Sequence, residues 1–206
     1  MLGYPVAGAN EEMEAGRRRY NFVWYRPADA DQQLPELLTD VDGARHELSI
    51  PPTRIRPEVI AAMRRDAEHL LAPQFAEVVR QTSQPFIQAI LDLEAPRMAC
   101  GTRTVILGDA AFVARPHVGM GVTKAALDAA ALADALRAHP TDLRAALTKF
   151  ESSRLPFGAA VVRRARQLGA YMQAQVATPE ERAMAEQYRT PEAVMTETAV
   201  AKGFVA

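Results

Sequence analysis

The feature that most constrains this chain is a short apolar run, residues 104–107, that ends at Gly108 and Asp109. A continuous run of β-branched and leucine residues is typical of a strand buried on both faces of a mostly parallel sheet. The run is therefore predicted to be a core strand. After a loop, an alanine-rich stretch predicts a long helix that ends near Ala138, because Pro140 disfavours helical backbone just before it.

Three parts of this stretch favour a ligand site. A carboxylate such as Asp109 at the carboxyl end of a strand lies where open α/β sheets hold ligands, and it accepts hydrogen bonds from sugar-like hydroxyls. Gly119 and Gly121 let the backbone approach a planar ligand, because they carry no Cβ. The free amide N–H groups and positive dipole end of the following helix favour a group that becomes negative, such as a reduced flavin ring.

Composition excludes several other classes of protein. The 206 residues are 49% hydrophobic and 24% charged, which is typical of a globular chain. The 24 Lys and Arg residues against 25 Asp and Glu residues argue against a nucleic-acid or membrane-surface binder. No run of 18 apolar residues and no signal peptide is present, so a cytoplasmic location is expected.

Neither a disulfide framework nor a metal site is predicted. The sequence has one cysteine, Cys100, which precedes the apolar run and is expected to have an inert packing role. His46, His69 and His139 have no matching carboxylate or cysteine spacing, so they are interpreted as structural or surface residues.

An aromatic strand is predicted near the start of the chain, over residues 18–26. Tyr20, Phe22 and Trp24 share one face of it, because side chains alternate along a strand. Two interpretations are open. The three rings wall a pocket for an aromatic substrate, or they pack in the core of a sheet, which is the more common outcome.

The remaining pattern predicts mostly helices. A segment flanked by prolines, residues 86–93, is predicted to be a strand, and no regular structure is expected beyond Thr190. Thr141 and Thr178 are predicted helix caps. Helical spacing of apolar residues predicts four further helices, over residues 57–71, 74–81, 141–173 and 178–189.

The stretch that begins at Gly108 resembles the second flavin-binding motif, the GD motif, of the FAD-dependent aromatic hydroxylases, which are flavoprotein monooxygenases. In that family the aspartate contacts the ribityl chain of FAD, and a Pro-x-x-Gly-x-Gly loop lies against the isoalloxazine ring. By this resemblance the cofactor-binding residues are Gly108, Asp109, Pro116, Val118, Gly119, Met120 and Gly121.

Further segments resemble one branch of the family, the 2,6-dihydroxypyridine 3-monooxygenases. They are residues 4–6 (YPV), 21–26 (NFVWYR) and 110–117 (AAFVARPH), and the resemblance covers residues 4 to about 175. Many relatives outside this branch have histidine at the position of Phe112. In the loop, Arg115 and His117 bind a phenolate-like substrate or tune its protonation, or they are an exposed, solvated pair; both interpretations are open.

The resemblance implies an α/β fragment of a hydroxylase-type FAD fold. Residues 1–97 correspond to part of a substrate-binding domain, residues 98–138 to the flavin-contacting strand, loop and helix, and residues 139–206 to a C-terminal helical region. The family's Gly-x-Gly-x-x-Gly turn, which holds the ADP pyrophosphate, is absent from the sequence. The chain is therefore expected to match only the C-terminal part of such an enzyme.

The activity that the resemblance implies is hydroxylation of an electron-rich aromatic or N-heteroaromatic ring, such as a dihydroxypyridine. FAD is the expected cofactor, NAD(P)H the reductant and O2 the source of oxygen. The expected partners are a small aromatic substrate and either an N-terminal FAD-binding half or a second copy of the chain. The alternative is an inactive remnant, or one half of a split flavoenzyme, that acts as a non-enzymatic interaction module.

Overall fold

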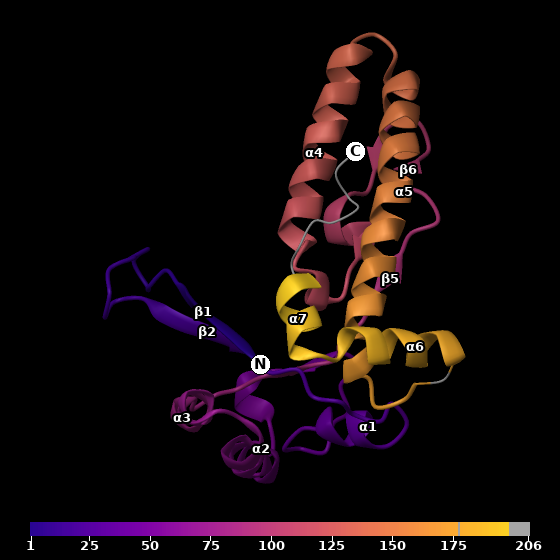
Figure 1. The fold of residues 1–206 in the computed structure, drawn as a ribbon. Helices are drawn as coiled ribbons and strands as arrows, with labels where there is room; N and C mark the ends of the chain where they lie inside the picture. The colour runs from indigo at the N-terminus through magenta and orange to yellow at the C-terminus, as the bar shows by residue number, and fades with distance from the viewer. Residues whose placement is uncertain (177, 198–206) are drawn as a thin grey trace. The chain divides into compact units, whose positions relative to one another are not determined.

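The computed structural model describes residues 1–176 and 178–197, and the chain divides into two compact units, Met1–Ala89 and Ile90–Ala206 (Figure 1). Both units combine helices with short antiparallel strands. This mixture confirms the predicted α/β fragment. No helix among the described residues is long and apolar enough to cross a membrane, and no three metal-ligating side chains in these residues lie together.

The first unit begins with a hairpin. Strand β1, Leu2–Val6, pairs antiparallel with β2, Arg19–Val23, which confirms the aromatic strand. The helices predicted over residues 57–71 and 74–81 are also confirmed, and each begins with a proline, whose fixed φ suits the first helical position. The other elements of this unit are α1 (Gln33–Leu37), β3 (Ser49–Ile50), α2 (Pro57–Leu70), α3 (Pro73–Gln81) and β4 (Ile87–Gln88).

The core of the first unit forms where β3 and β4 pair antiparallel. Leu38, Ile50, Ile55 and Ala89 are buried together there, and apolar side chains of α2 pack against them. Ala89 donates its N–H to the Leu48 carbonyl at 2.8 Å, which extends the pairing by one residue.

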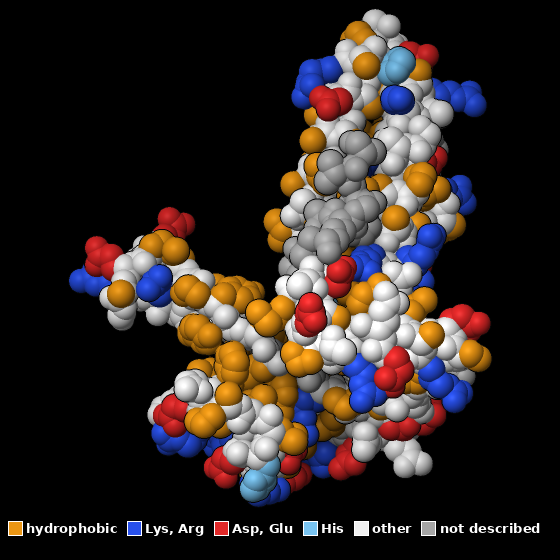
Figure 2. All heavy atoms as spheres, in the orientation of Figure 1, with side chains coloured by type: hydrophobic (Ala, Val, Ile, Leu, Met, Phe, Trp, Pro, Cys, Tyr) orange, Lys and Arg blue, Asp and Glu red, His pale blue; other side chains and the backbone are white. Residues whose placement is uncertain are grey.

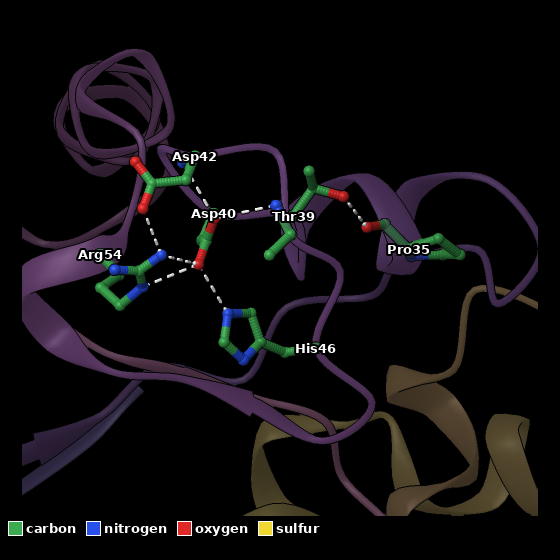
Figure 3. A network of polar contacts seen from close by, with 7 residues as sticks. Pro35, Thr39, Asp40, Asp42, His46 and Arg54 are labelled. Carbon is green, nitrogen blue, oxygen red and sulfur yellow. Dashed lines mark hydrogen bonds and ion pairs between the residues drawn. The ribbon is translucent and has the colours of Figure 1, made fainter.

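A buried carboxylate, Asp40, organises the turn that leads into β3 (Figure 3). One of its oxygens lies 2.9 Å from His46 Nε2 and accepts a hydrogen bond from Arg54 Nε at 2.8 Å. Its other oxygen accepts the backbone N–H groups of Asp42 and Ala44. The hydrogen bond with His46, followed by those from Arg54 and the two amides, holds the pKa of Asp40 well below its usual range.

This network predicts an acid-sensitive first unit. Because the pKa of Asp40 is lower in the folded than in the unfolded chain, its stabilising contribution is complete above about pH 4 and is lost as the pH falls through the folded value. Asp40→Asn should lower the urea midpoint at pH 7, and the difference from wild type should shrink below about pH 4. Asp42→Asn removes an exposed partner of Arg54 and is the control, with little expected change. A gap between wild type and Asp40→Asn that stays constant down to low pH would contradict this account.

The second unit is built on two long helices, α4 (Gly121–Ala138) and α5 (Leu143–Gly169), that run side by side (Figure 1). Asp142 caps α5 by accepting the N–H of Ala145 at 2.9 Å. The remaining elements are β5 (Leu93–Glu94), β6 (Ala99–Cys100), β7 (Thr104–Val105), β8 (Phe112–Val113), α6 (Pro179–Tyr188) and α7 (Pro191–Glu197).

The predicted core strand over residues 104–107 is wrong in both length and pairing. Only β7, Thr104–Val105, is a strand, and it pairs antiparallel with β6. Ile106 adds one bond, from its N–H to the Met98 carbonyl. Among the described residues this segment pairs only with β6, and Thr104 is exposed while Val105 is half-buried, so it is not a central strand buried on both faces.

Three smaller predictions also need correction. Residues 86–93 are not one strand, because β4 and β5 are separate and pair with different partners. The cap of α5 is Asp142 rather than Thr141, since the Asp142 carboxylate is the group that accepts the helix N–H. Beyond Thr190 the chain forms α7, and residues 198–206, which were expected to be irregular, lie outside the described residues. The capping box at Thr178 is confirmed.

The core of the second unit forms between α5 and the short strands. Phe112 of β8 and Phe150 of α5 are almost fully buried in one apolar cluster with Met98 and Val162. Glu151 of α5 accepts the N–H groups of Met98 and Ala99 at 2.6 and 2.9 Å, which ties the β6–β7 hairpin to the helix. Cys100 in this hairpin is exposed, so its predicted packing role is wrong.

Candidate functional site

The turn after β7 presents Asp109 to solvent. Residues Gly108–Ala110 form one turn of 3-10 helix, and Gly108 adopts a left-handed φ of 59° that favours glycine. Gly108 donates its N–H to Asp128 Oδ2 at 3.0 Å, which anchors the turn to α4. The Asp109 side chain is 73% exposed, so its carboxylate is available to a ligand.

The loop before α4 ends in two glycines with different surroundings. Gly119 has a φ of 63° and donates its N–H to the Pro116 carbonyl, so its own backbone requires glycine. Gly121, the first residue of α4, has no such requirement. A Cβ added to it would meet no heavy atom of the described residues within 4 Å, and no side chain caps the helix. The first N–H groups of α4 therefore lie beside an open backbone surface.

Two of the predicted cofactor-binding side chains point into the protein instead. Val118 and Met120 are buried in an apolar cluster with Val161, Ala165 and Leu168 of α5. Their packing fixes the loop between them, so any contact that they make with a ligand is through the backbone.

His117 is buried, so it is not part of an exposed, solvated pair with Arg115. Its ring packs against Gly169 so closely that a Cβ there would lie 2.2 Å from His117 Cδ2. Burial, with a smaller effect of the Arg115 charge, lowers the pKa of His117 to about 4. The imidazole is therefore neutral near pH 7.

Arg115 is held by one ion pair and one hydrogen bond within the second unit. Its Nε donates to Asp92 Oδ2 at 2.7 Å, and its Nη1 donates to Gln173 Oε1 at 2.5 Å. Arg166 of α5 donates to the other oxygen of Asp92 at 2.6 Å. Asp92 thus joins two arginines, which fixes the loop before α4 to the end of α5.

The three aromatic residues of the predicted strand belong to the first unit, and Trp24 lies one residue beyond the end of β2. Tyr20 is 51% exposed and lies against Gly3, while Phe22 and Trp24 are half-buried. Figure 2 shows apolar side chains gathered along this two-stranded hairpin. Tyr20 is therefore not packed in a core, because the two-stranded sheet that carries it leaves about half of the side chain exposed.

The sequence analysis missed a group of charged side chains beneath the Asp109 turn. Lys124 of α4 is fully buried, with its Nζ 3.9 Å from both Asp109 Oδ1 and Asp128 Oδ2. Arg154 of α5 donates from Nε to Asp128 Oδ1 at 2.8 Å. Lys124 and Asp128 are four residues apart in a predicted helix whose intervening residues are uncharged, and this spacing could have indicated that the two side chains lie together.

Comparison with known proteins shows which enzymes the chain resembles. A family model described as FAD binding domain-like matches residues 1–92. The chain is 32% identical over 173 residues to 2,6-dihydroxypyridine 3-monooxygenase of Paenarthrobacter nicotinovorans, which covers 84% of this chain and 42% of that protein. Over most of its length, the chain is similar to an FAD-dependent aromatic hydroxylase. The predicted resemblance to the dihydroxypyridine branch is thereby confirmed.

Structure supports the same assignment. The solved 2,6-dihydroxypyridine-3-hydroxylase of Arthrobacter nicotinovorans matches with a TM-score of 0.73 and 31% identity, over 89% of this chain and 45% of that chain. An FAD-dependent urate hydroxylase of Mycolicibacterium vanbaalenii is 42% identical over 77 residues, 37% of this chain and 20% of that protein. The chain thus spans less than half the length of the hydroxylases that it matches.

Proposed function

We propose that the segment from Gly108 to Gly121 holds the ribityl chain and ring of FAD, and that the protein serves hydroxylation of an electron-rich aromatic or N-heteroaromatic ring. The observation that carries this proposal is Gly121. Neither its backbone conformation nor its neighbours among the described residues require glycine, whereas a flat ligand against the start of α4 does.

The residues present fit a flavin in three ways. Asp109 is exposed and accepts hydrogen bonds from the hydroxyls of a ribityl chain. The uncapped N–H groups of α4 suit a ring that becomes negative on reduction. His117 is buried beneath the loop as a neutral group, so it adds no positive charge to the site near pH 7.

FAD would supply the redox chemistry, in which NAD(P)H reduces the flavin and the reduced flavin activates O2. The chain's own residues bind and orient the flavin. Asp109 would hold the ribityl chain, the backbone of Gly119 and Gly121 would leave room for the ring, and the N-terminus of α4 would stabilise negative charge on it. The Asp92 ion pairs and the packing of Val118 keep this surface rigid before the flavin arrives.

The proposed substrate class is a small aromatic or N-heteroaromatic ring such as a dihydroxypyridine, as in the name of the relative that matches 84% of this chain. Tyr20, Phe22 and Trp24 are the proposed aromatic contacts, because planar rings stack well against one another. Arg115 and His117 are also proposed as substrate contacts. Because Arg115 is bonded to Asp92 and His117 is buried, we propose that both residues mainly hold the loop in position.

The ADP part of FAD requires a further binding segment, and we propose that this segment packs against the outer face of α4. That face is apolar: Val122 is 88% exposed and Leu136 40%, and the exposed Ala126, Ala129 and Ala130 lie between them on the same side of the helix. A helix with an apolar outer face is typically covered by protein. In the hydroxylases that the chain matches, more than half of the length lies outside the matched part.

The test is a titration of the 206-residue chain with riboflavin, FMN and FAD, followed by visible absorbance and flavin fluorescence. Asp109→Ala should weaken binding of all three about tenfold, because a charged hydrogen-bond acceptor is lost. The chain should stay folded and lose only a little stability, since the Asp109 side chain is 73% exposed and its one charged neighbour among the described residues, Lys124 Nζ, is 3.9 Å away. Asp134→Ala, an exposed carboxylate further along α4, is the matched control. Equal affinity of Asp109→Ala and wild type would remove the role of Asp109, and a folded wild-type chain that binds no flavin would contradict a site formed by this chain alone.

A further inference from the structure

Lys124 is the least expected side chain in the second unit. It lies in the first turn and a half of α4, it is fully buried, and its Nζ has no hydrogen-bond partner among the described residues. Burying an ammonium group without hydrogen bonds is costly, and this burial lowers the pKa of Lys124. A lysine at such a position needs a compensating role, and the two carboxylates near it suggest one.

The two carboxylates differ in what else holds them. Asp128 accepts hydrogen bonds from Arg154 Nε and from the Gly108 N–H, so both of its oxygens already have donors. Asp109 is different. Within residues 1–176 and 178–197, the structure gives its carboxylate one charged neighbour, the Nζ of Lys124 at 3.9 Å.

We propose that Lys124 is a positioning residue that holds the Asp109 carboxylate over its turn. Asp128 and Arg154 fix the floor of the turn, and the Lys124 ammonium lies between that pair and Asp109. A carboxylate that is fixed in advance loses less conformational freedom when a ligand binds. This role rests on the proposed flavin site for its purpose, but the link between Lys124 and Asp109 is a property of the chain without flavin.

The first experiment measures that link without any ligand. NMR titration of the Lys124 ε-methylene group in the full chain reports the pKa of its ammonium. Because the Asp109 charge raises that pKa, Asp109→Asn should lower it further. Asp134→Asn, which removes an exposed carboxylate ten residues along α4 from Lys124, should leave it unchanged. An unchanged Lys124 pKa in Asp109→Asn would overturn the proposal.

The second experiment asks whether the link serves the ribityl chain. Lys124→Met should weaken riboflavin binding about three- to tenfold in the wild-type background and have no effect in the Asp109→Ala background. Lumiflavin, which has the ring but no ribityl chain, should bind Lys124→Met and wild type equally. Lys124→Gln repeats the measurement if the methionine variant fails to fold, as judged by circular dichroism.

The outcomes separate the two proposals. An equal loss of riboflavin affinity in both backgrounds, or an equal loss for lumiflavin, means that Lys124 acts independently of Asp109 and overturns its positioning role. If the wild-type chain binds neither flavin, the failure falls on the proposed function. The NMR titration then decides alone whether Lys124 holds Asp109.

Discussion

Gly158→Ala is expected to destabilise the second unit by about 1–3 kcal/mol, which is the usual cost of overpacking a core. Gly158 lies inside α5, and a Cβ there would fall 2.4 to 2.7 Å from ring atoms of Phe112. Phe112 is 1% exposed and packs with Met98, Phe150 and Val162, so its ring can move aside only by displacing these side chains. The sign is informative, because glycine to alanine inside a helix normally stabilises by about 0.5–1 kcal/mol.

The cause can be isolated with a second substitution at Phe112. In a Phe112→Leu background the ring is gone, and Gly158→Ala should become neutral or stabilising. The measurement is urea unfolding of the four variants, followed by circular dichroism. An equal loss of stability in both backgrounds would show that the contact with Phe112 is not the reason for glycine at this position.

Gly121→Val is expected to weaken flavin binding about ten- to hundredfold, because overpacking costs about 1–3 kcal/mol and each 1.4 kcal/mol is about tenfold. The free chain should keep its stability, since the added side chain meets no atom of the described residues within 4 Å at its Cβ. The effect should therefore appear only when a ligand lies against the start of α4. Fluorescence titration with riboflavin measures the affinity, and thermal unfolding measures the stability.

Ala126→Val is the matched control for Gly121→Val. It places the same side chain on an exposed position of the same helix, about one turn further from the loop. Riboflavin affinity should be unchanged in this variant. If Gly121→Val binds riboflavin as tightly as wild type does, the ring does not lie against Gly121, and the loop's second glycine has no ligand-based explanation.

Local sequence signals predicted the helices of this chain well. Pro57 at the first position and apolar residues at helical spacing located α2, the segment after Pro73 was predicted as α3, and the capping box at Thr178 located α6. These signals depend on residues within one or two turns, so they persist in any surroundings. The strands were predicted less well, because a strand exists only with a partner and the partner is set by the rest of the fold.

The candidate site shows the same division between local and tertiary information. The Gly108–Asp109 turn, the two loop glycines and the start of α4 were all visible in the sequence, because each is a pattern of residues that are adjacent in the chain. The buried group of Lys124, Asp128 and Arg154 was not, since Arg154 is 26 residues from Asp128 and reaches it only when α5 packs on α4.

From the sequence alone we identified the resemblance to the hydroxylases, most of the helices and the residues of the loop before α4. Which of those loop residues are open to a ligand depends on the tertiary structure. Packing against α5 turns Val118 and Met120 inward and buries His117 on Gly169, while Asp109 and Gly121 stay open. The physical reason is that burial and pairing depend on neighbours distant in sequence, and a local pattern carries no information about them.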